Sequence, residues 1–325
     1  SMHPTSAIEM NMFGKYTKNY SDIKQARIEI KHGNYEAAAK LFDGKLKPFL
    51  GDKESATALS DGLKTAINSV YGLTSASFDN PFRHKKNNDN IVAKRGALFM
   101  IDLKHAVQEK GYTVAHIKTD SIKIPDANQE IIDFVFEFGK RYGYTFEHEA
   151  TYNRLALVNK STYICQVGWS PKESKIGTWS ATGAQFQEPY VFKTMFSKEP
   201  IEIEDFFISK EVKDAAIYLD DHFIGRIANI YASLTGGTIM RVKDEKRGAI
   251  SGTKGHRWRL SKDWVGYKDV DMSFYKKLIV DAIGAIKAVG DASIMIDNLE
   301  TLEIDEEDLP TERFDVPPDK RPTVT

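Results

Sequence analysis

Helical and strand periodicities alternate along this chain, and that alternation limits the possible folds more than any other feature of the sequence. Apolar residues recur at helical spacing in segments such as 21–32 and 56–73. The segment "YTVAHIKTDSIKIP" instead alternates apolar and polar residues on both sides of a bend. Helices packed on one face of small antiparallel sheets satisfy this order. The sequence therefore predicts an α+β protein, and it contains no internal repeat.

The composition is that of a soluble globular protein with a sizeable core. The 325 residues are 41% hydrophobic, which suffices for one large or two medium domains. No apolar run approaches the roughly 18 residues that a membrane span requires, so we expect no membrane partner. The lone cysteine, Cys165, excludes an intramolecular disulfide and a multi-cysteine zinc site. We expect Cys165 to be a core residue.

Charge is distributed unevenly along the chain. The formal net charge of −1 argues weakly against a simple nucleic-acid-binding domain, which is usually basic. However, residues 1–100 hold 15 Lys and Arg against 10 Asp and Glu, and residues 241–262 hold eight against two. Residues 300–315 are strongly acidic. The acidic segment thus offsets two basic regions in the net charge of the whole chain.

The predicted helices 21–32 and 56–73 form a helical hairpin, joined by turns in residues 33–53. Beside their apolar stripes lies a basic and polar face made of Lys24, Arg27, Lys31, Lys64, Asn68 and Tyr71. A cation, an amide and an aromatic ring on one face suit an anionic ligand that carries a flat base. Either charged stripe alone is equally explained as a solvated helix face. Basic residues on both helices favour phosphate binding.

Further helices are expected at residues 90–111, in "NQEIIDFVFEFGKRYG" and near 271–289. The segment "TFEHEATYNRLALVNKSTYICQVG" predicts two strands joined by a turn from Asn159 to Ser161. Beyond about residue 181 the pattern changes to helical periods, a stretch rich in Gly, Lys and Arg, and a proline-containing tail. We therefore expect a domain boundary near residue 185 and disorder in the last ten residues.

Asp120 lies at the bend of "HIKTDSIKIP". A carboxylate at a hairpin tip most often forms the turn by bonding its own backbone. A hairpin tip can also direct an acid at Mg²⁺, which takes few protein carboxylates and completes its octahedron with water and substrate phosphate. One carboxylate is too few for a site with two metal ions. Asp120 therefore needs a partner.

Five segments resemble motifs of family B DNA polymerases, in that family's order. "KTAINSVYG" (64–72) resembles the fingers motif Lys-x3-Asn-Ser-x-Tyr-Gly, and "KTDS" (118–121) resembles the palm motif Asp-Thr-Asp-Ser. Arg27 and Lys31 match the Arg and Lys of the first fingers helix. "NKSTY" (159–163) is similar to the Lys-Lys-x-Tyr motif, and "SMHPT" (1–5) to Ser-Leu-Tyr-Pro-Ser of the first palm motif. The sequence around "AHIKTDSIKI" resembles that of tailed-phage polymerases, whose site of action is the host cytoplasm.

The resemblance implies a role for each matching residue. Asp120 would be the catalytic, metal-binding Asp of a site for two Mg²⁺ ions, where one ion activates the primer 3′ hydroxyl and the other holds the leaving pyrophosphate. The dNTP would be bound by Ser1, Met2, His3, Arg27, Lys31, Lys64, Asn68 and Tyr71. Primer–template DNA would be held by Lys160 and Tyr163.

The resemblance also implies domains. These are palm at 1–18, a fingers helical hairpin at 19–77, an antiparallel-sheet palm with packed helices at 78–185, a mostly helical thumb at 186–310 and a tail at 311–325. In the thumb, Lys254, Arg257 and Arg259 are expected to bind DNA phosphates. A solvated loop with packed Trp258 and Trp264 explains the same segment equally well. The acidic residues 300–308 would repel DNA, so we expect them to face away from the duplex or to cap another protein.

Three departures from the family limit the prediction. Lys118 replaces the first Asp of the palm hairpin, and His3 replaces the Tyr that screens the ribose 2′ position, which leaves ribose exclusion open. The family's other essential Asp lies three residues before its Ser-Leu-Tyr-Pro-Ser, at a position upstream of Ser1. We therefore expect negligible synthesis by this chain alone.

The start of the sequence, Ser1-Met2-His3-Pro4, has no signal-peptide pattern and indicates a processed or engineered end. The chain is then a cut piece of a polymerase, a natural split subunit or a splicing product in which Ser1 follows an intein. An N-terminal polymerase fragment would supply the exonuclease domain and the first palm Asp. Two alternatives remain: a non-catalytic nucleic-acid-binding module with a degenerate palm, and an unrelated nucleotide-binding α+β enzyme.

Overall fold

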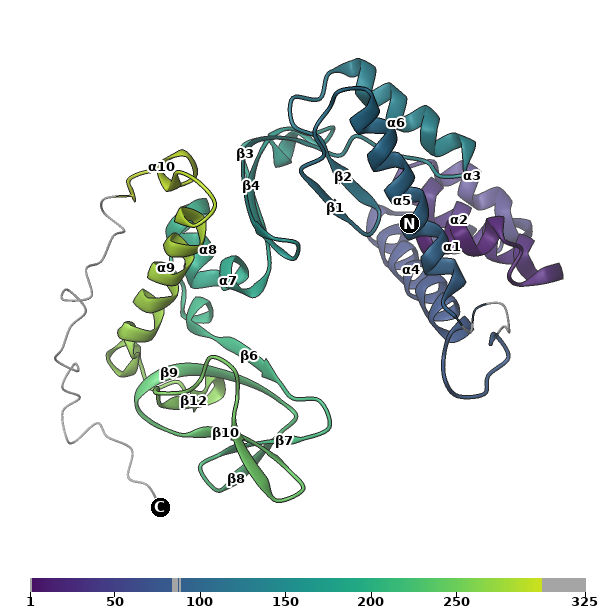
Figure 1. Ribbon diagram of the computed structural model, residues 1–325. Coiled ribbons are helices and arrows are strands. Elements are labelled where there is room, and N and C mark those ends of the chain that lie inside the picture. The colour runs from purple at the N-terminus through teal and green to yellow at the C-terminus, as the bar shows by residue number, and fades with distance from the viewer. Residues whose placement is uncertain (1, 84–86, 88, 300–325) are drawn as a thin grey trace. The chain divides into compact units, whose positions relative to one another are not determined.

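The computed structural model describes residues 2–83, 87 and 89–299. The chain divides into two compact units, Ser1–His148 and Glu149–Thr325. Each hydrophobic cluster of the described residues lies within one unit. Figure 1 labels the helices and strands that make up each unit. The division thus falls earlier than the boundary expected near residue 185, and the expected palm, residues 78–185, is distributed over both units.

The first unit is mainly helical and holds a small hairpin. Its elements are α1 (Met2–Glu9), a 3₁₀ turn (Gly14–Tyr16), α2 (Thr17–Lys31), α3 (Tyr35–Lys40), 3₁₀ turns (Leu41–Gly44 and Lys47–Phe49), α4 (Lys53–Thr74), α5 (Ile91–Glu109), β1 (His116–Lys118), β2 (Ser121–Lys123) and α6 (Gln129–Arg141). The expected helices, hairpin and bend are confirmed. Helix α3 departs from the expectation, because the glycines and proline of residues 33–53 predict only turns.

Two helices of the first unit pack as the expected helical hairpin. Apolar residues of α2 and α4 share clusters, and the hydroxyl of Tyr20 on α2 donates to the carbonyl of Ile67 on α4 at 2.9 Å. Helix α4 begins at its N-cap, Asp52, whose carboxylate accepts from the backbone N–H of Ser55. These hydrogen bonds hold the pKa of Asp52 below its usual value, as expected for an acid at a helix N-terminus.

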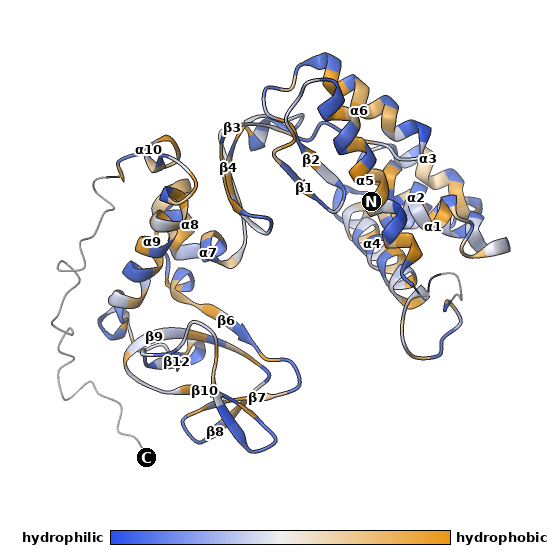
Figure 2. Cartoon of the chain, in the orientation of Figure 1, coloured by the Kyte–Doolittle hydropathy of each residue, from blue (hydrophilic) through white to orange (hydrophobic). Residues whose placement is uncertain are grey.

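The β1–β2 hairpin rests on helices α5 and α6. The expected apolar stripe of α6 is confirmed, because Ile131, Val135 and Phe138 are buried. They form one cluster with Phe99, Met100 and Leu103 of α5, and Ile117 and Ile122 of the hairpin pack against it. Figure 2 shows the corresponding alternation of hydrophobic and hydrophilic residues along α5 and α6. This core fixes the position of the hairpin.

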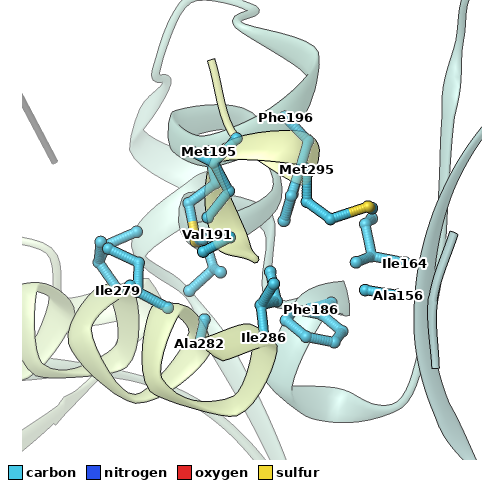
Figure 3. Packing of buried hydrophobic residues seen from close by; sticks show 13 residues of the cluster. Ala156, Ile164, Phe186, Val191, Met195, Phe196, Ile279, Ala282, Ile286 and Met295 are labelled. Atoms are coloured by element: carbon cyan, nitrogen blue, oxygen red, sulfur yellow. The ribbon is translucent and has the colours of Figure 1, made fainter. Parts of the chain in front are cut away.

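The second unit begins with a three-stranded antiparallel sheet, in the order β3 (Thr151–Asn159), β4 (Thr162–Trp169) and β5 (Trp179–Thr182). Its core combines Ala156 and Ile164 of this sheet with apolar residues of the helices α7 (Ala184–Gln187), α8 (Pro189–Phe192), α9 (Met272–Lys287) and α10 (Ala292–Met295), as Figure 3 shows. A boundary at residue 185 would divide this core. Cys165 on β4 is buried, as expected.

The expectation of a mostly helical segment 186–310 is wrong for its described part. Between α8 and α9 the chain forms a π-helix (Lys193–Ser197), 3₁₀ turns (Ile203–Phe206, Ser261–Asp263 and Tyr267–Asp269) and seven strands: β6 (Ile208–Glu211), β7 (Ala216–Leu219), β8 (His222–Gly225), β9 (Ile227–Gly237), β10 (Ile239–Lys243), β11 (Lys246–Ala249) and β12 (Trp258–Leu260). They form antiparallel sheets in the orders β11-β10-β7-β8 and β12-β9-β6. The tail, 311–325, lies outside the described residues.

The core of this strand-rich part is built on aromatic side chains. Trp258, Tyr231 and Tyr275 are fully buried, and Trp264 packs against the same cluster. The indole N–H of Trp258 donates to the carbonyl of Thr253 at 3.0 Å. Trp258 and Trp264 are therefore packed, as one of the two explanations of this segment predicts. Through the described ranges, no helix is both long and apolar enough to cross a membrane.

Candidate functional site

Asp120 lies exposed in a two-residue turn between β1 and β2, where Lys118 pairs with Ser121. The hydroxyl of Ser121 donates to the carbonyl of Lys118 at 3.2 Å, which closes the turn. Thr119, before the acid, has a φ of 52°. A β-branched residue at positive φ is strained, and such strain is concentrated at functional sites. The structure thus presents the carboxylate of Asp120 at the end of a constrained hairpin.

The same core that carries the hairpin also holds the beginning of α1. Met2 is buried in the cluster that includes α5 and α6, with Ile117 and Ile122 of the hairpin packed against it. Helix α1 approaches α5 at Gly96, where a Cβ atom would overlap the side chain of Met2. The absence of a side chain at Gly96 therefore lets Met2 and the hairpin share one core.

His3 follows Met2 and stacks on Tyr71 of α4. The ring centroids lie 4.9 Å apart and the planes differ by 2°. The Tyr71 hydroxyl donates to Oδ1 of Asn90 at 3.4 Å, and burial raises the pKa of Tyr71. His3 and Tyr71 come from separate motifs, and the family resemblance assigns both to one nucleotide site. In the structure their rings are in direct contact. Ser1, the first residue of the "SMHPT" motif, lies outside the described residues.

The predicted basic face is present on α2 and α4, with cations in different environments. Arg27 lies four residues after Ile23 and three before the buried Ile30, so it lies on the side of α2 that packs toward α4. Its Nε atom is buried and has no hydrogen-bond partner among the described residues. Burial lowers the pKa of Lys24, and the nearby Glu9 partly offsets this effect. Because its buried Nε has no hydrogen-bond partner among the described residues, Arg27 is a donor suited to an anionic ligand.

Lys64 and Asn68 lie exposed on α4, on the same side as Tyr71. Their spacing of four and three residues places the three side chains along one stripe of the helix. No ion pair of Lys64 is found within the part of the chain that the structure describes. The stripe that the sequence predicted is therefore present.

Lys31 is engaged with an acid instead. Its Nζ lies 3.1 Å from Oε2 of Glu147, and Nε2 of His32 lies 3.2 Å from Oε1 of the same carboxylate. The hydrogen bond from Lys31 holds the pKa of Glu147 below its usual value, although burial partly opposes this. To contact a phosphate, Lys31 must break its ion pair with Glu147 or bind the carboxylate and the phosphate at the same time.

The described residues do not by themselves complete a magnesium site. Mg²⁺ prefers oxygen ligands and commonly takes one or two protein carboxylates, so Asp120 fits as one ligand. The hairpin residues 116–123 contain no second acid, and Lys118 places a cation beside the first. Within the described ranges, no group of three or more His, Cys, Asp or Glu side chains is arranged to hold a metal ion.

The predicted DNA contacts lie in the second unit. Lys160 is exposed in the turn between β3 and β4, and Tyr163 is half-buried on β4, where it pairs with Leu157 and Thr182. Lys254 and Arg257 are exposed in the segment that precedes β12. These four side chains are accessible to a ligand.

Arg259 is placed differently from the expectation. Its Nε lies 3.3 Å from Oδ2 of Asp269, and Nη2 donates to the Thr235 hydroxyl at 2.8 Å. Asp269 is itself buried and accepts hydrogen bonds from Tyr231 and Ser233. A guanidinium in this network helps to hold the fold together, so Arg259 has a structural role, and its contact with DNA stays a prediction.

Sequence patterns did not point to Glu147 or Asn90. Glu147 lies far from Lys31 in the sequence, and Asn90 approaches Tyr71 because the chain turns back between α4 and α5. Local periodicity carries no information on such contacts. The turn between α4 and α5 is fixed by Asn87, which is buried and donates to the Thr74 hydroxyl at 2.5 Å.

Comparison of the sequence with protein-family models gives no match, and comparison with curated proteins gives no significant match.

Proposed function

We propose that this chain forms the fingers, palm and thumb of a family B DNA polymerase and takes part in template-directed DNA synthesis. The five motif resemblances in family order motivate the proposal. The observation that carries it is the parallel stack of His3 on Tyr71. Two motifs that this enzyme class uses for one nucleotide thus meet, beside the core that carries the hairpin of Asp120.

In this proposal the helical hairpin binds the incoming dNTP. Arg27 and Lys64 contact the triphosphate, joined by Lys31 once it leaves Glu147. His3 lies beside the sugar, while Asn68 and Tyr71 lie beside the nascent base pair. Lys160, Tyr163, Lys254 and Arg257 contact primer–template DNA. These roles come from the motif resemblance, and the exposure of Lys64, Asn68 and Lys160 supports them.

Asp120 is the catalytic acid of the proposal, and a second acid comes from a polypeptide segment outside residues 1–325. When bound, Mg²⁺ supplies positive charge at the reacting phosphate and lowers the pKa of the primer hydroxyl. Asp120 positions this charge from the tip of its hairpin. The strained backbone at Thr119 and the core beneath Ile117 and Ile122 keep the acid in place.

The test mixes the chain with the polypeptide encoded directly upstream of the Ser1 codon, a primed template, dNTPs and Mg²⁺. We expect templated primer extension by the mixture and none by the chain alone. Asp120→Asn should lower the extension rate by at least on the order of a thousandfold, because a group that organises transition-state charge is lost. Asp102→Asn, a matched change at an exposed acid of α5, should leave the rate unchanged.

One observation favours a second candidate, a non-catalytic nucleic-acid-binding module: Lys118 stands where the family has an acid. This candidate predicts duplex binding without extension in every mixture. Extension that survives Asp120→Asn would refute the proposed role of the hairpin. Nucleotide turnover without a template would instead indicate an unrelated enzyme.

A further inference from the structure

The sheet β11-β10-β7-β8 of the second unit has two unlike faces. Ile217 and Ile239 on one face are buried in the aromatic core of the strand-rich part. Successive residues of a strand point to opposite faces, so Tyr218 and Met240 lie on the other face. The register pairs Met240 with Tyr218 and Tyr218 with Phe223, which places the three side chains in one row across three strands. We call Met240, Tyr218 and Phe223 the outer row.

The outer row is accessible on the second unit. Phe223 is 63% exposed, whereas Tyr218 and Met240 are half-buried. All three lie outside the hydrophobic clusters of the described residues. The rings of Tyr218 and Phe223 contact each other, with centroids 5.8 Å apart and planes that differ by 62°. Because this contact is close to edge-on, most of the Phe223 ring stays open to a flat ligand.

Positive charge lies beside the outer row. The strands of this sheet contain no acid and four exposed cations, which are Arg241, Lys243, Lys246 and Arg247. Arg247 pairs with Val242, two residues after Met240, and therefore lies on the same face as the outer row. The sheet thus presents aromatic rings and a guanidinium on one surface.

Acids near this surface occupy the turns. Asp220 and Asp221 lie in the β7–β8 turn, and Asp244 and Glu245 lie in the β10–β11 turn. Asp220 accepts a hydrogen bond from the backbone N–H of Thr238 at 2.8 Å. Asp221 lies 2.9 Å from the guanidinium of Arg247, and both side chains are exposed. Exposed ion pairs contribute little to stability, so a phosphate can replace Asp221 at Arg247.

The size of the face distinguishes a protein partner from a nucleic acid. Two aromatic side chains offer about 300–500 Å² when fully exposed, which is less than the roughly 800 Å² that each partner buries in a stable protein interface. A base needs only one ring to stack on, and its phosphate needs a nearby cation. In a duplex the bases stack on one another, whereas the bases of a single strand are free. The outer row therefore suits a single strand.

We propose that the outer row binds single-stranded nucleic acid, with bases stacked on Phe223 and Tyr218 and a phosphate at Arg247. This site is additional to the duplex contacts of the proposed function and needs no template-directed synthesis. Every base has a π-face, so stacking of this kind tolerates any sequence. The expected ligand is a single strand without a required sequence.

The test titrates the full chain into a fluorescein-labelled single strand of about twelve thymidines, within the roughly 4–16 nucleotides that such sites cover. Anisotropy measures the Kd in about 50 mM salt, where phosphate contacts are strong. Phe223→Leu keeps an apolar side chain but removes the ring, so it should weaken binding at least about fivefold. Phe223→Trp keeps a ring and should bind at least as tightly as wild type. Ile227→Ala, at a similarly exposed apolar residue of β9, should leave the Kd unchanged.

The phosphate contact is tested by the dependence of binding on salt. Arg247→Gln should lower the slope of log Kd against log salt concentration by about 0.7, the contribution of one phosphate of a single strand. Lys172→Gln, at an exposed lysine of the same unit, should leave the slope unchanged. An unchanged slope in Arg247→Gln would refute the phosphate contact. A matched strand of uridines identifies the source of the ligand, because the strand that loses more affinity with Phe223→Leu is the one that the rings bind.

Equal affinity of wild type and Phe223→Leu for both oligonucleotides would overturn the proposal and leave this face to a protein partner. Equal losses in Phe223→Leu and Phe223→Trp would also overturn it, because a ring would then not suffice. Circular dichroism checks that each variant is folded.

A blunt duplex separates this inference from the proposed function. Phe223→Leu should leave duplex affinity unchanged, because paired bases cannot stack on the ring, and an equal loss for duplex and single strand would refute stacking. If the single strand binds as expected but the chain and its upstream polypeptide extend no primer, the proposed function fails and this site stands.

Discussion

At the scale of single residues, Lys31 shows how one cation can be shared between a structural partner and a ligand. Its ammonium group is 3.1 Å from Glu147, and both side chains are close to half exposed. An ion pair of this kind contributes at most about 1 kcal/mol. A triphosphate, with several negative charges, can therefore displace Glu147 at a small cost. Glu147 acts as a weak competitor for the cation that the proposal assigns to the nucleotide.

Removal of this competitor should strengthen nucleotide binding. Glu147→Gln should lower the Kd for a fluorescent dNTP about two- to fivefold, because the energy lost with an exposed ion pair is up to about 1 kcal/mol. Fluorescence titration measures the effect. Glu137→Gln removes the exposed partner of Lys140 on α6 and should leave this Kd unchanged. An unchanged Kd in Glu147→Gln would show that Lys31 does not contact the triphosphate.

At the scale of elements, the approach of α1 to α5 depends on Gly96. A Cβ atom there would overlap the Met2 side chain, which has to move. Met2 belongs to the hairpin's core, and its neighbour His3 stacks on Tyr71. One small residue on α5 thus governs the positions of two proposed site elements.

Gly96→Ala should therefore destabilise the first unit by about 1–2 kcal/mol, since the cost of overpacking exceeds the gain in helix propensity. Urea denaturation followed by far-UV circular dichroism measures the change. Gly62→Ala on α4 meets no atom within 4 Å and should stabilise by up to about 1 kcal/mol. Equal effects of the two substitutions would contradict the packing role of Gly96.

Elements with a strong period could be predicted from the sequence. The stripe of Ile131, Val135 and Phe138 indicated α6, and the run from Asn159 to Ser161 indicated the β3–β4 turn. Two of the hairpins between α8 and α9 are hard to predict, because the β7–β8 and β10–β11 turns lack the usual glycine signal. Asp220, Asp244 and Glu245 adopt positive φ in these turns. Aspartate and glutamate adopt positive φ less readily than glycine does. Turns built on them are therefore hard to recognise in a sequence.

Contacts within the candidate site were predictable only in part. The stripe of Lys64, Asn68 and Tyr71 follows from helical spacing, and it is present on α4. The stack of His3 on Tyr71 and the pairing of Glu147 with Lys31 join residues far apart in the sequence. They depend on how α1, α2 and α4 pack, which no local pattern specifies. The ion pair of Arg259 with the buried Asp269 cannot be recognised from composition either.

At the scale of the whole molecule, the two units have separate hydrophobic cores among the described residues. All four tryptophans lie in the second unit, at positions 169, 179, 258 and 264. Tryptophan fluorescence therefore reports on the second unit, whereas far-UV circular dichroism reports on the helices of both units. A transition that circular dichroism shows and tryptophan fluorescence does not therefore belongs to the first unit.

Asp269→Ala should destabilise the second unit by about 3–5 kcal/mol, because it leaves the guanidinium of Arg259 buried without its acid. The denaturant midpoint of tryptophan fluorescence should fall accordingly. Asp263→Ala, at an exposed acid nearby, should stay within about 0.5 kcal/mol of wild type. The circular-dichroism transition that tryptophan fluorescence does not share should keep its midpoint in both variants. A shift of that midpoint with Asp269→Ala would show that the two units unfold together.

The architecture of the β1–β2 turn has an evolutionary consequence. The turn is closed by its backbone, by Ser121 and by the apolar residues beneath it, so the exposed acid at its tip adds little to the persistence of the fold. A gene that exchanged this acid for an amide would still encode a well-folded product. Selection for chemistry and selection for folding therefore act on different positions, and descendants that have lost catalysis can be retained as binding proteins.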